Sequence, residues 1–187
     1  ELTWDHLLRM SSGLEFLEVY TLPSADAAQM LFGRARTARG AYAASRPLAH
    51  PIDTHWSYSS GTTNILQYAM LEAVFEGDLA AYLRFPHEAL FEPLGMTSAV
   101  LEPDASGVYV GSSHMFATAR DWARFGQLFL DGGRAGNRTL LSSRWLAYSL
   151  RPTSTKPDGT YGAQWWLNHD PEIGERRWPR LAANVFA

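Results

Sequence analysis

Apolar residues recur at helical spacing in several stretches of the chain. The clearest stripe consists of Ile65, Leu66, Ala69, Met70, Ala73 and Val74, with spacings of four and one. Because residues four apart share one face of an α-helix, this stripe predicts a helix from Thr62 to Phe75.

Further helices are predicted where a capping residue precedes apolar positions. The caps and apolar positions are Thr3 before Trp4, Leu7 and Leu8; Ser24 before Ala27, Ala28, Met30 and Leu31; Asp78 before Leu79, Tyr82 and Leu83; Thr118 before Trp122, Phe125, Leu128 and Phe129; and Ser142 or Ser143 before Trp145 and Leu146. We expect Gly13 to end the first of these helices, Pro86 to begin a helical turn and Pro93–Met96 to form a turn. The stretch from Gly33 to Trp56 loses periodicity.

Only one stretch alternates as a strand does. Tyr161, Ala163, Trp165 and Leu167 alternate with smaller or polar residues, which predicts a strand between Tyr161 and Asn168. Together, these patterns predict a mostly helical α+β fold.

The composition is that of a globular protein, and it removes several kinds of function. The chain has 187 residues, 46% of them hydrophobic and 19% charged, and contains no cysteine. This excludes disulfides, thiolate metal sites and cysteine nucleophiles. A net charge of -3 without basic runs argues against a nucleic-acid partner. No stretch approaches the roughly 18 apolar residues of a membrane span, so we expect none.

Both ends of the chain resemble interior positions of a longer protein. The chain begins Glu1-Leu2-Thr3-Trp4 without methionine or a secretory signal, and it stops without a polar tail. We therefore expect a truncated N-terminus, which leaves both the cytoplasm and the periplasm open as locations.

The sequence predicts neither a metal site nor a cofactor. His50 and His55 are close in sequence, but Pro51 prevents a shared helical face and no third ligand is adjacent. Lys156 is the single lysine, and Thr155 stands where a phosphate-binding Walker A loop needs glycine.

The segment from His55 to Thr62 gathers hydroxyl groups directly before the clearest helix. Tyr58, Ser59 and Ser60 would lie near the positive end of that helix, which can stabilise a phenolate or a developing oxyanion. The alternative is structural, with Ser60 or Thr62 capping the helix and Tyr58 packing.

Four short segments are each too common to identify a family alone, but their order along the chain is specific. They are His6–Gly13, Tyr58–Gly61, Pro93–Met96 and Ala117–Gly126. In this order they resemble the serine beta-lactamase and penicillin-binding family, and more narrowly the branch of class C beta-lactamases, carboxylesterases and 6-aminohexanoate-dimer hydrolases. The resemblance implies the helical subdomain of the beta-lactamase/transpeptidase-like fold over residues 1–150. It implies the start of an antiparallel sheet near 161–168, in an incomplete α/β subdomain over residues 151–187.

The resemblance also implies roles for individual residues. The family has a serine nucleophile in a Ser-x-x-Lys helix, a base or proton relay in a Tyr-x-Asn or Tyr-x-Ser loop, and a basic element on a late strand. Tyr58 matches the base or relay, and Ser60 matches the third position of that motif as a hydrogen-bonding neighbour. Tyr20 falls where the aminohexanoate hydrolases have a substrate-contacting tyrosine. Trp56 and Trp166 are candidate walls of an acyl pocket, with core packing as the alternative.

The family's nucleophile is missing from these residues. No serine has a lysine three positions later, and the nearest pattern, Thr153 to Lys156, has threonine in a proline-flanked loop. A tyrosine with the ordinary pKa near 10 is a poor base, and lowering that pKa to near 7 takes about 4 kcal/mol, which lysine ammonium groups can supply. We therefore expect the Ser-x-x-Lys element to lie outside this chain and the chain alone to be inactive.

The resemblance implies a portion of a serine hydrolase that acts on ester, amide or beta-lactam carbonyls through an acyl-enzyme. Class C beta-lactamases usually have asparagine where this chain has Ser60, so an esterase or linear-amide hydrolase is favoured. The expected partners are a small-molecule ester, amide or lactam substrate and the remaining part of the same enzyme. The alternative is a non-catalytic binding or sensor module that keeps the scaffold without the nucleophile.

Overall fold

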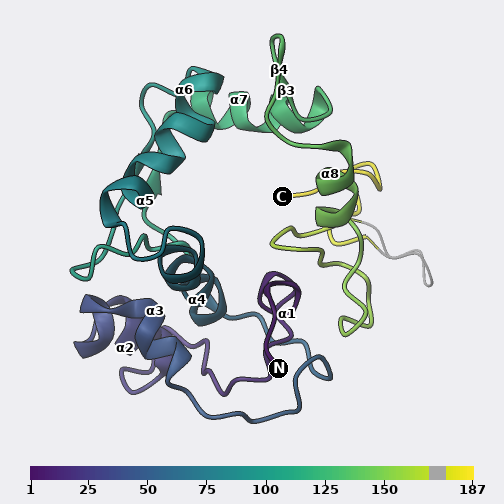
Figure 1. Ribbon diagram of the computed structural model, residues 1–187. Coiled ribbons are helices and arrows are strands. Elements are labelled where there is room, and N and C mark those ends of the chain that lie inside the picture. The colour runs from purple at the N-terminus through teal and green to yellow at the C-terminus, as the bar shows by residue number, and fades with distance from the viewer. Residues whose placement is uncertain (169–175) are drawn as a thin grey trace. The chain divides into compact units, whose positions relative to one another are not determined.

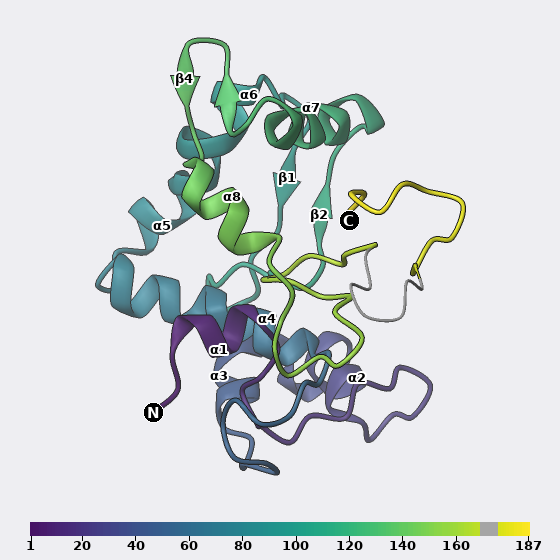
Figure 2. The ribbon, with the colours of Figure 1, turned by 90° about the vertical axis from the view of Figure 1, so that its right-hand side faces the viewer.

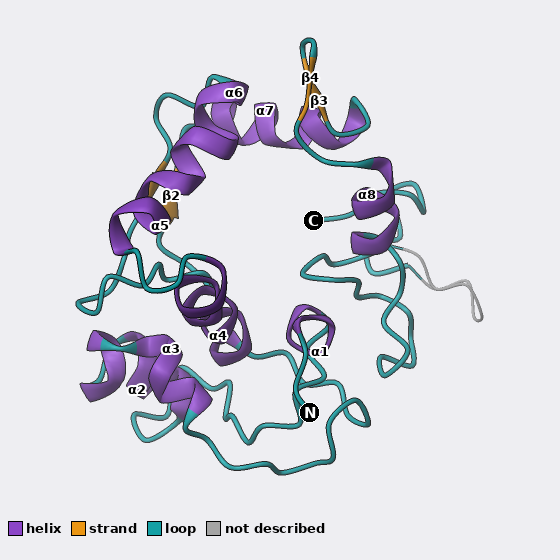
Figure 3. Ribbon diagram, in the orientation of Figure 1, coloured by secondary structure: helices purple, strands orange, loops and turns teal. Residues whose placement is uncertain are grey.

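The computed structural model describes residues 1–168 and 176–187, which form two compact units. Unit 1 consists of Glu1–Glu15, Pro47–Tyr58 and Arg144–Ala187, and unit 2 consists of Phe16–Arg46 and Ser59–Ser143. Helices supply most of the regular structure (Figure 3), and the strands are short antiparallel pairs. The predicted α+β, mostly helical class is therefore confirmed. Every helix among the described residues falls short, in length or in apolar character, of what a bilayer span requires.

The two units do not follow the predicted division after residue 150. Unit 1 joins the N-terminal segment to the C-terminal one, because Arg9, only 5% exposed, hydrogen-bonds between them. Its guanidinium donates to the carbonyl oxygens of Tyr148 and Arg151 at 3.1 and 3.0 Å. The assignment of 1–150 and 151–187 to subdomains of a longer fold stays a prediction.

Unit 1 contains helix α1 (Trp4–Leu8) and all of helix α8 (Ser143–Ser149) except its first residue. Thr3 caps α1 as predicted, since its hydroxyl accepts a hydrogen bond from the His6 N–H. The helix ends at Leu8, well before Gly13. Two features require glycine at position 13: its φ is +73°, and a Cβ there would lie 2.3 Å from the His50 carbonyl oxygen.

Unit 2 contains more elements. In chain order its helices are α2 (Asp26–Leu31), η1 (Arg34–Thr37), α3 (Arg39–Ala44), α4 (Ser60–Ala69), η2 (Met70–Val74), α5 (Leu79–Pro86), η3 (His87–Phe91), α6 (Glu92–Leu94) and α7 (Ala119–Leu130). Here η1 is a 3₁₀-helix, while η2 and η3 are π-helices that directly follow α4 and α5. Figure 1 shows α5 continuing towards α6. Strand β1 (Val100–Leu101) pairs with β2 (Met115–Phe116), side by side in Figure 2, and β3 (Arg134–Ala135) pairs with β4 (Arg138–Thr139).

The helices predicted after Asp78 and Thr118 are confirmed. Each of these side chains caps its helix by accepting a hydrogen bond from the N–H three residues later. The turn predicted at Pro93–Met96 forms only in part: Pro93 and Leu94 belong to α6, which Gly95 ends in the left-handed conformation. Pro86, however, lies inside a continuing helix and does not begin a new one. Its missing N–H coincides with the change from α-helical to π-helical hydrogen bonding at η3.

The predicted cap of α2 was wrong. The helix begins after Ala25 rather than after Ser24, and Ala25 offers no side-chain hydrogen bond. The Asp26 carboxylate instead accepts hydrogen bonds from the Leu17 N–H at 2.9 Å and the Tyr42 hydroxyl at 2.7 Å. Long-range partners therefore take the place of a local cap.

The predicted strand over 161–168 is replaced by a tight turn. Tyr161 and Trp166 form an antiparallel bridge with each other, and between them Gln164 has φ +65°. Only beyond this turn does the chain pair further, through an antiparallel bridge between Leu167 and Phe186. The antiparallel character was predicted correctly, and the single continuous strand was not.

Candidate active-site elements

Aromatic side chains of unit 1 bring together three of the predicted site residues. Tyr58 stacks on Trp166, with ring centroids 5.3 Å apart and planes tilted by 29°. Tyr161 packs edge-on against Trp166 at 4.9 Å and against Trp56 at 5.4 Å. Such pairs contribute about 0.5–1.5 kcal/mol each beyond their buried area. We call Trp56, Tyr58, Tyr161 and Trp166 the aromatic cluster.

The loop that bears Trp56 and Tyr58 is fixed by hydrogen bonds to the segment after α1. The Ser57 N–H donates to the Met10 carbonyl at 3.0 Å, and the Asp53 N–H donates to the Ser11 carbonyl at 3.0 Å. Because backbone bonds hold the loop on both sides of Trp56, the two aromatic residues have defined positions in the cluster.

The two tyrosines of the cluster differ in exposure. Tyr161 is 2% exposed, and burial, followed by the nearness of Tyr58, raises the pKa of Tyr161. Tyr161 is therefore a neutral packing residue at physiological pH. Tyr58 is 41% exposed, so it is the more accessible of the two tyrosines.

Two cations lie against the cluster, and sequence reasoning had given neither a place there. The Lys156 ammonium lies 4.6 Å from the Trp56 ring centroid and 2.5 Å from an Asp158 carboxylate oxygen. The Arg177 guanidinium carbon lies 3.7 Å from the Trp166 ring centroid. Cations near aromatic faces are stabilised by the negative charge of the π-system.

Ser60 and Tyr20 meet in unit 2 through a carboxylate. The Glu18 side chain accepts hydrogen bonds from the Ser60 N–H at 2.9 Å, from the Ser60 hydroxyl at 2.5 Å and from the Tyr20 hydroxyl. The Tyr20 and Ser60 hydroxyl oxygens are 3.4 Å apart. Ser60 is 7% exposed and Tyr20 is 54% exposed, so this group extends from the interior of unit 2 to its surface.

The structure shows that Ser60 is not the N-cap of α4. Helix α4 is capped by Ser59, whose hydroxyl accepts from the Thr62 N–H at 3.1 Å. Ser60 is the first helical residue and Thr62 supplies the capped N–H, so neither is the cap. The Ser60 hydroxyl is therefore available for the contact with Glu18.

Glu18 is a further residue that the sequence did not predict. Its only sequence signal is its position two residues before Tyr20, a spacing that brings two side chains to the same side of an extended chain. Its contact with Ser60 depends on Gly61, where a Cβ would lie 2.4 Å from Cε2 of Phe16. The glycine thus permits the 16–20 segment to lie directly against the start of α4.

The comparisons with known proteins decide the family. A family model described as Beta-lactamase matches residues 1–182. The chain belongs to the beta-lactamase family. Over 79 aligned residues it is 33% identical to the 6-aminohexanoate-dimer hydrolase of Paenarthrobacter ureafaciens, an alignment that covers 36% of this chain and 20% of that protein.

Solved structures share the fold of this beta-lactamase-family chain. A Bacillus anthracis protein assigned as a 6-aminohexanoate-dimer hydrolase matches with a TM-score of 0.70 and 20% identity, covering 97% of this chain and 48% of that one. A beta-lactamase from Mycobacterium bovis matches with a TM-score of 0.56 and 19% identity, covering 94% and 56%. The chain thus spans about half the length of these structures.

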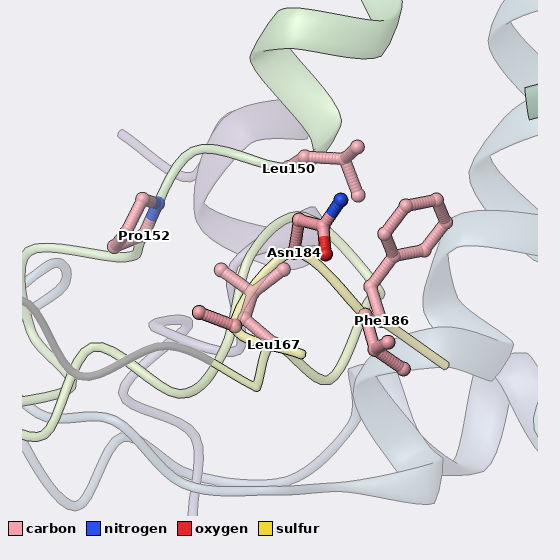
Figure 4. A pocket seen from close by; sticks show the side chains of 7 residues that line it. Leu150, Pro152, Leu167, Asn184 and Phe186 are labelled. Atoms are coloured by element: carbon pink, nitrogen blue, oxygen red, sulfur yellow. The ribbon is translucent and has the colours of Figure 1, made fainter. Parts of the chain in front are cut away.

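Outside the aromatic cluster, unit 1 of the beta-lactamase-family chain also has an apolar cavity of about 400 Å³. Figure 4 shows the side chains of Leu150, Leu167 and Phe186 around it, and none of the five predicted site residues is among the described residues that line it. Among residues 1–168 and 176–187, no three His, Asp or Glu side chains are placed to share a metal ion. His50 and His55 are instead stacked with ring centroids 4.1 Å apart.

Proposed function

We propose that this chain is the part of a serine hydrolase that contributes Tyr58 as base or proton relay, with the Ser-x-x-Lys nucleophile elsewhere in the full-length parent protein. The observation that supports this most directly is the beta-lactamase family match over residues 1–182, which includes the Tyr58-Ser59-Ser60-Gly61 motif. The exposed position of Tyr58 in an otherwise packed cluster is consistent with this role.

The proposed reaction proceeds in two stages. The serine oxygen of the parent attacks the substrate carbonyl carbon, and its proton passes by way of Tyr58 to the leaving alcohol or amine as the C–O or C–N bond breaks. A water molecule then attacks the acyl-serine ester, its proton returns to the serine oxygen, and the carboxylic acid is released. Tyr58 serves either as the base itself or as a relay between the serine and a neutral lysine.

The chain also supplies a hydrogen-bonded group to the proposed function. It consists of Ser60, Tyr20 and Glu18. Glu18 fixes both hydroxyl groups through its carboxylate, which restricts their rotation. Groups that are already oriented lose less conformational entropy when substrate binds. We therefore infer that Ser60 and Tyr20 orient the substrate, and that Trp56 and Trp166 form a wall of its acyl pocket.

The substrate class we favour is an ester or a linear amide. The 6-aminohexanoate-dimer hydrolase with 33% identity is named for a linear amide, and serine occupies position 60 where class C beta-lactamases usually have asparagine. A beta-lactam is the second candidate, because the family model is the Beta-lactamase one.

Hydrolysis assays of the full-length parent test this proposal. We expect turnover of p-nitrophenyl butyrate and a lower rate with a chromogenic cephalosporin. Tyr58→Phe, which keeps the stacked ring and removes the hydroxyl, should lower the acylation rate by about 100-fold or more, the usual range for loss of an acid–base group. Circular dichroism and the urea midpoint of the variant should match the parent.

Two outcomes would count against the proposal in different ways. An unchanged acylation rate in Tyr58→Phe would remove Tyr58 from the reaction. A full-length parent with no Ser-x-x-Lys element and no hydrolysis of either substrate would favour the non-catalytic binding or sensor module instead.

A further inference from the structure

Lys156, the single lysine of the chain, lies over one ring of the aromatic cluster. Its ammonium is 4.6 Å from the Trp56 ring centroid, and its side chain is only 17% exposed. The same ammonium donates to an Asp158 carboxylate oxygen at 2.5 Å. A cation that is partly removed from water interacts more strongly with an aromatic ring than one at an exposed site. Lys156 therefore contributes to the position of the Trp56 ring.

Hydrogen bonds close the turn that bears Lys156. The Lys156 N–H donates to the Thr153 carbonyl at 3.1 Å, and the Gly159 N–H donates to the Lys156 carbonyl at 3.0 Å. One carboxylate oxygen of Asp158 accepts from the N–H and the hydroxyl of Thr160 at 3.0 and 2.8 Å. Burial acts to raise the pKa of Asp158, but the hydrogen bonds from Lys156 and Thr160 outweigh it and lower this pKa. The carboxylate is thus charged at neutral pH and fixes the ammonium.

The same turn is joined to the aromatic cluster through the backbone. The Thr153 N–H donates to the Tyr161 carbonyl at 2.7 Å, and Tyr161 forms an antiparallel bridge with Trp166. The ring centroids of Tyr161 and Trp166 lie 5.4 and 5.9 Å from that of Trp56. One connected piece of backbone therefore places the ammonium and two aromatic rings against Trp56.

Ring contacts, rather than a hydrogen bond, determine the orientation of the Trp56 side chain. Its indole nitrogen is buried and has no hydrogen-bond partner in the part of the chain that the structure describes. Its ring centroid lies 6.4 Å from that of Tyr58. A change in the orientation of Trp56 therefore displaces the Tyr58 ring, and with it the phenol oxygen. Since proton transfer requires the reacting groups within hydrogen-bond reach, such a displacement lowers the rate.

We propose that Lys156 is a positioning residue of the hydrolytic site, which holds the Trp56 ring through a cation–π contact and, through that ring, the phenol of Tyr58. This inference rests on the proposed function, because it takes Tyr58 as the base or proton relay. In this role Lys156 neither binds the substrate nor transfers a proton. Asp158 supports it by fixing the ammonium over the ring.

Lys156→Met tests the proposal in the full-length parent, because methionine keeps an unbranched side chain and removes the charge. We expect acylation by p-nitrophenyl butyrate to slow about fivefold, as the loss of one partly desolvated cation–π contact implies. Lys156→Gln should give the same loss, so the result does not depend on the folding of one variant. Lys156→Arg should restore most of the rate, since a guanidinium also stacks on an indole. Arg138→Met, which removes the charge of an exposed arginine in β4, should leave the rate unchanged.

A double-mutant cycle shows whether Lys156 acts through Tyr58. Tyr58→Phe has no phenol oxygen to position, so adding Lys156→Met to it should slow the remaining acylation less than about 1.5-fold. A fivefold loss in both backgrounds would mean that Lys156 acts independently of Tyr58 and would overturn the proposal. An unchanged rate in Lys156→Met, no recovery in Lys156→Arg, or an equal loss in Arg138→Met would also overturn it.

Nuclear magnetic resonance of the full-length parent separates this proposal from the hydrolytic one. The indole N–H signal of Trp56 and the ring signals of Tyr58, assigned with Trp56→Phe and Tyr58→Phe, should shift in Lys156→Met and return in Lys156→Arg. If the parent hydrolyses no ester but these signals respond, the proposed function fails and the positioning of both rings by Lys156 remains. If hydrolysis occurs and neither the rate nor the signals respond, the positioning role fails alone.

Discussion

Ser59 and Ser60 are adjacent hydroxyl residues with different partners. The Ser59 hydroxyl accepts from a backbone N–H and so stabilises the start of α4, whereas the Ser60 hydroxyl donates to the Glu18 carboxylate. The first contact stabilises a helix, and the second positions a hydroxyl group within the proposed site. The two residues can therefore be tested separately.

Replacing each serine by alanine should separate stability from activity. Ser59→Ala should lower the unfolding free energy by about 1 kcal/mol, the usual effect of losing an N-cap, and leave acylation by the parent nearly unchanged. Ser60→Ala should lower the acylation rate by about tenfold with a smaller loss of stability, because water can replace the lost partner of the half-buried Glu18. Urea unfolding and pre-steady-state acylation measure the two effects. A stability loss at Ser60 equal to that at Ser59, with acylation unchanged, would assign Ser60 a structural role.

The sequence was informative about residues within one motif and uninformative about residues joined by tertiary contacts. Tyr58 and Ser60 follow from a short motif of fixed spacing. Glu18 has no such motif, because its role depends on how the 16–20 segment approaches Gly61. Lys156 was missed for the same reason, since it contacts Trp56, a residue distant in sequence.

Helix α3 shows why the pattern between Gly33 and Trp56 was uninformative. Its residues are mostly small, so no large apolar side chains mark a face. The helix nevertheless packs tightly, because a Cβ at Gly40 would lie 2.5 Å from Cβ of Tyr68 and 2.8 Å from the Asn64 carbonyl oxygen in α4. Small residues stabilise α3 by allowing close backbone approach, which hydrophobic periodicity cannot reveal.

Two helical glycines should respond oppositely to alanine. Gly40→Ala should lower the unfolding free energy by about 1–3 kcal/mol, since overpacking against α4 outweighs the gain in helix propensity. Gly126→Ala in α7 should raise it by about 1 kcal/mol, because nothing lies within 4 Å of the added Cβ. Urea denaturation of the two variants measures both. A stabilising Gly40→Ala would contradict the close packing of α3 on α4.

The alternation between Tyr161 and Asn168 correctly predicted extended structure at its C-terminal end, but it predicted too long a strand. The Trp166–Asn168 end does pair with another extended segment, through Leu167 and Phe186 and through the Asn168 N–H. The Tyr161 end folds back on Trp166 instead, because Gln164 adopts a left-handed conformation that the side-chain pattern does not encode. Side-chain alternation indicates which residues share a face, and it does not locate a turn.

For the molecule as a whole, family membership and the single lysine together define which part of the proposed hydrolytic site the chain can supply. The Beta-lactamase match extends over residues 1–182, yet the chain spans only about half of the solved structures that it resembles. Its one lysine, Lys156, lies against Trp56 and Asp158 and has no serine three residues before it. The division into two units was not apparent from the sequence, because contacts such as those of Arg9 join segments far apart in the chain.

Labelling with a fluorophosphonate, located by mass spectrometry, tests the central claim most directly. We expect one label per full-length parent molecule, on a serine outside this 187-residue chain, and no label on the isolated chain. Stoichiometric labelling of the isolated chain at any of its own serines would contradict the claim that it supplies Tyr58 to a nucleophile located elsewhere.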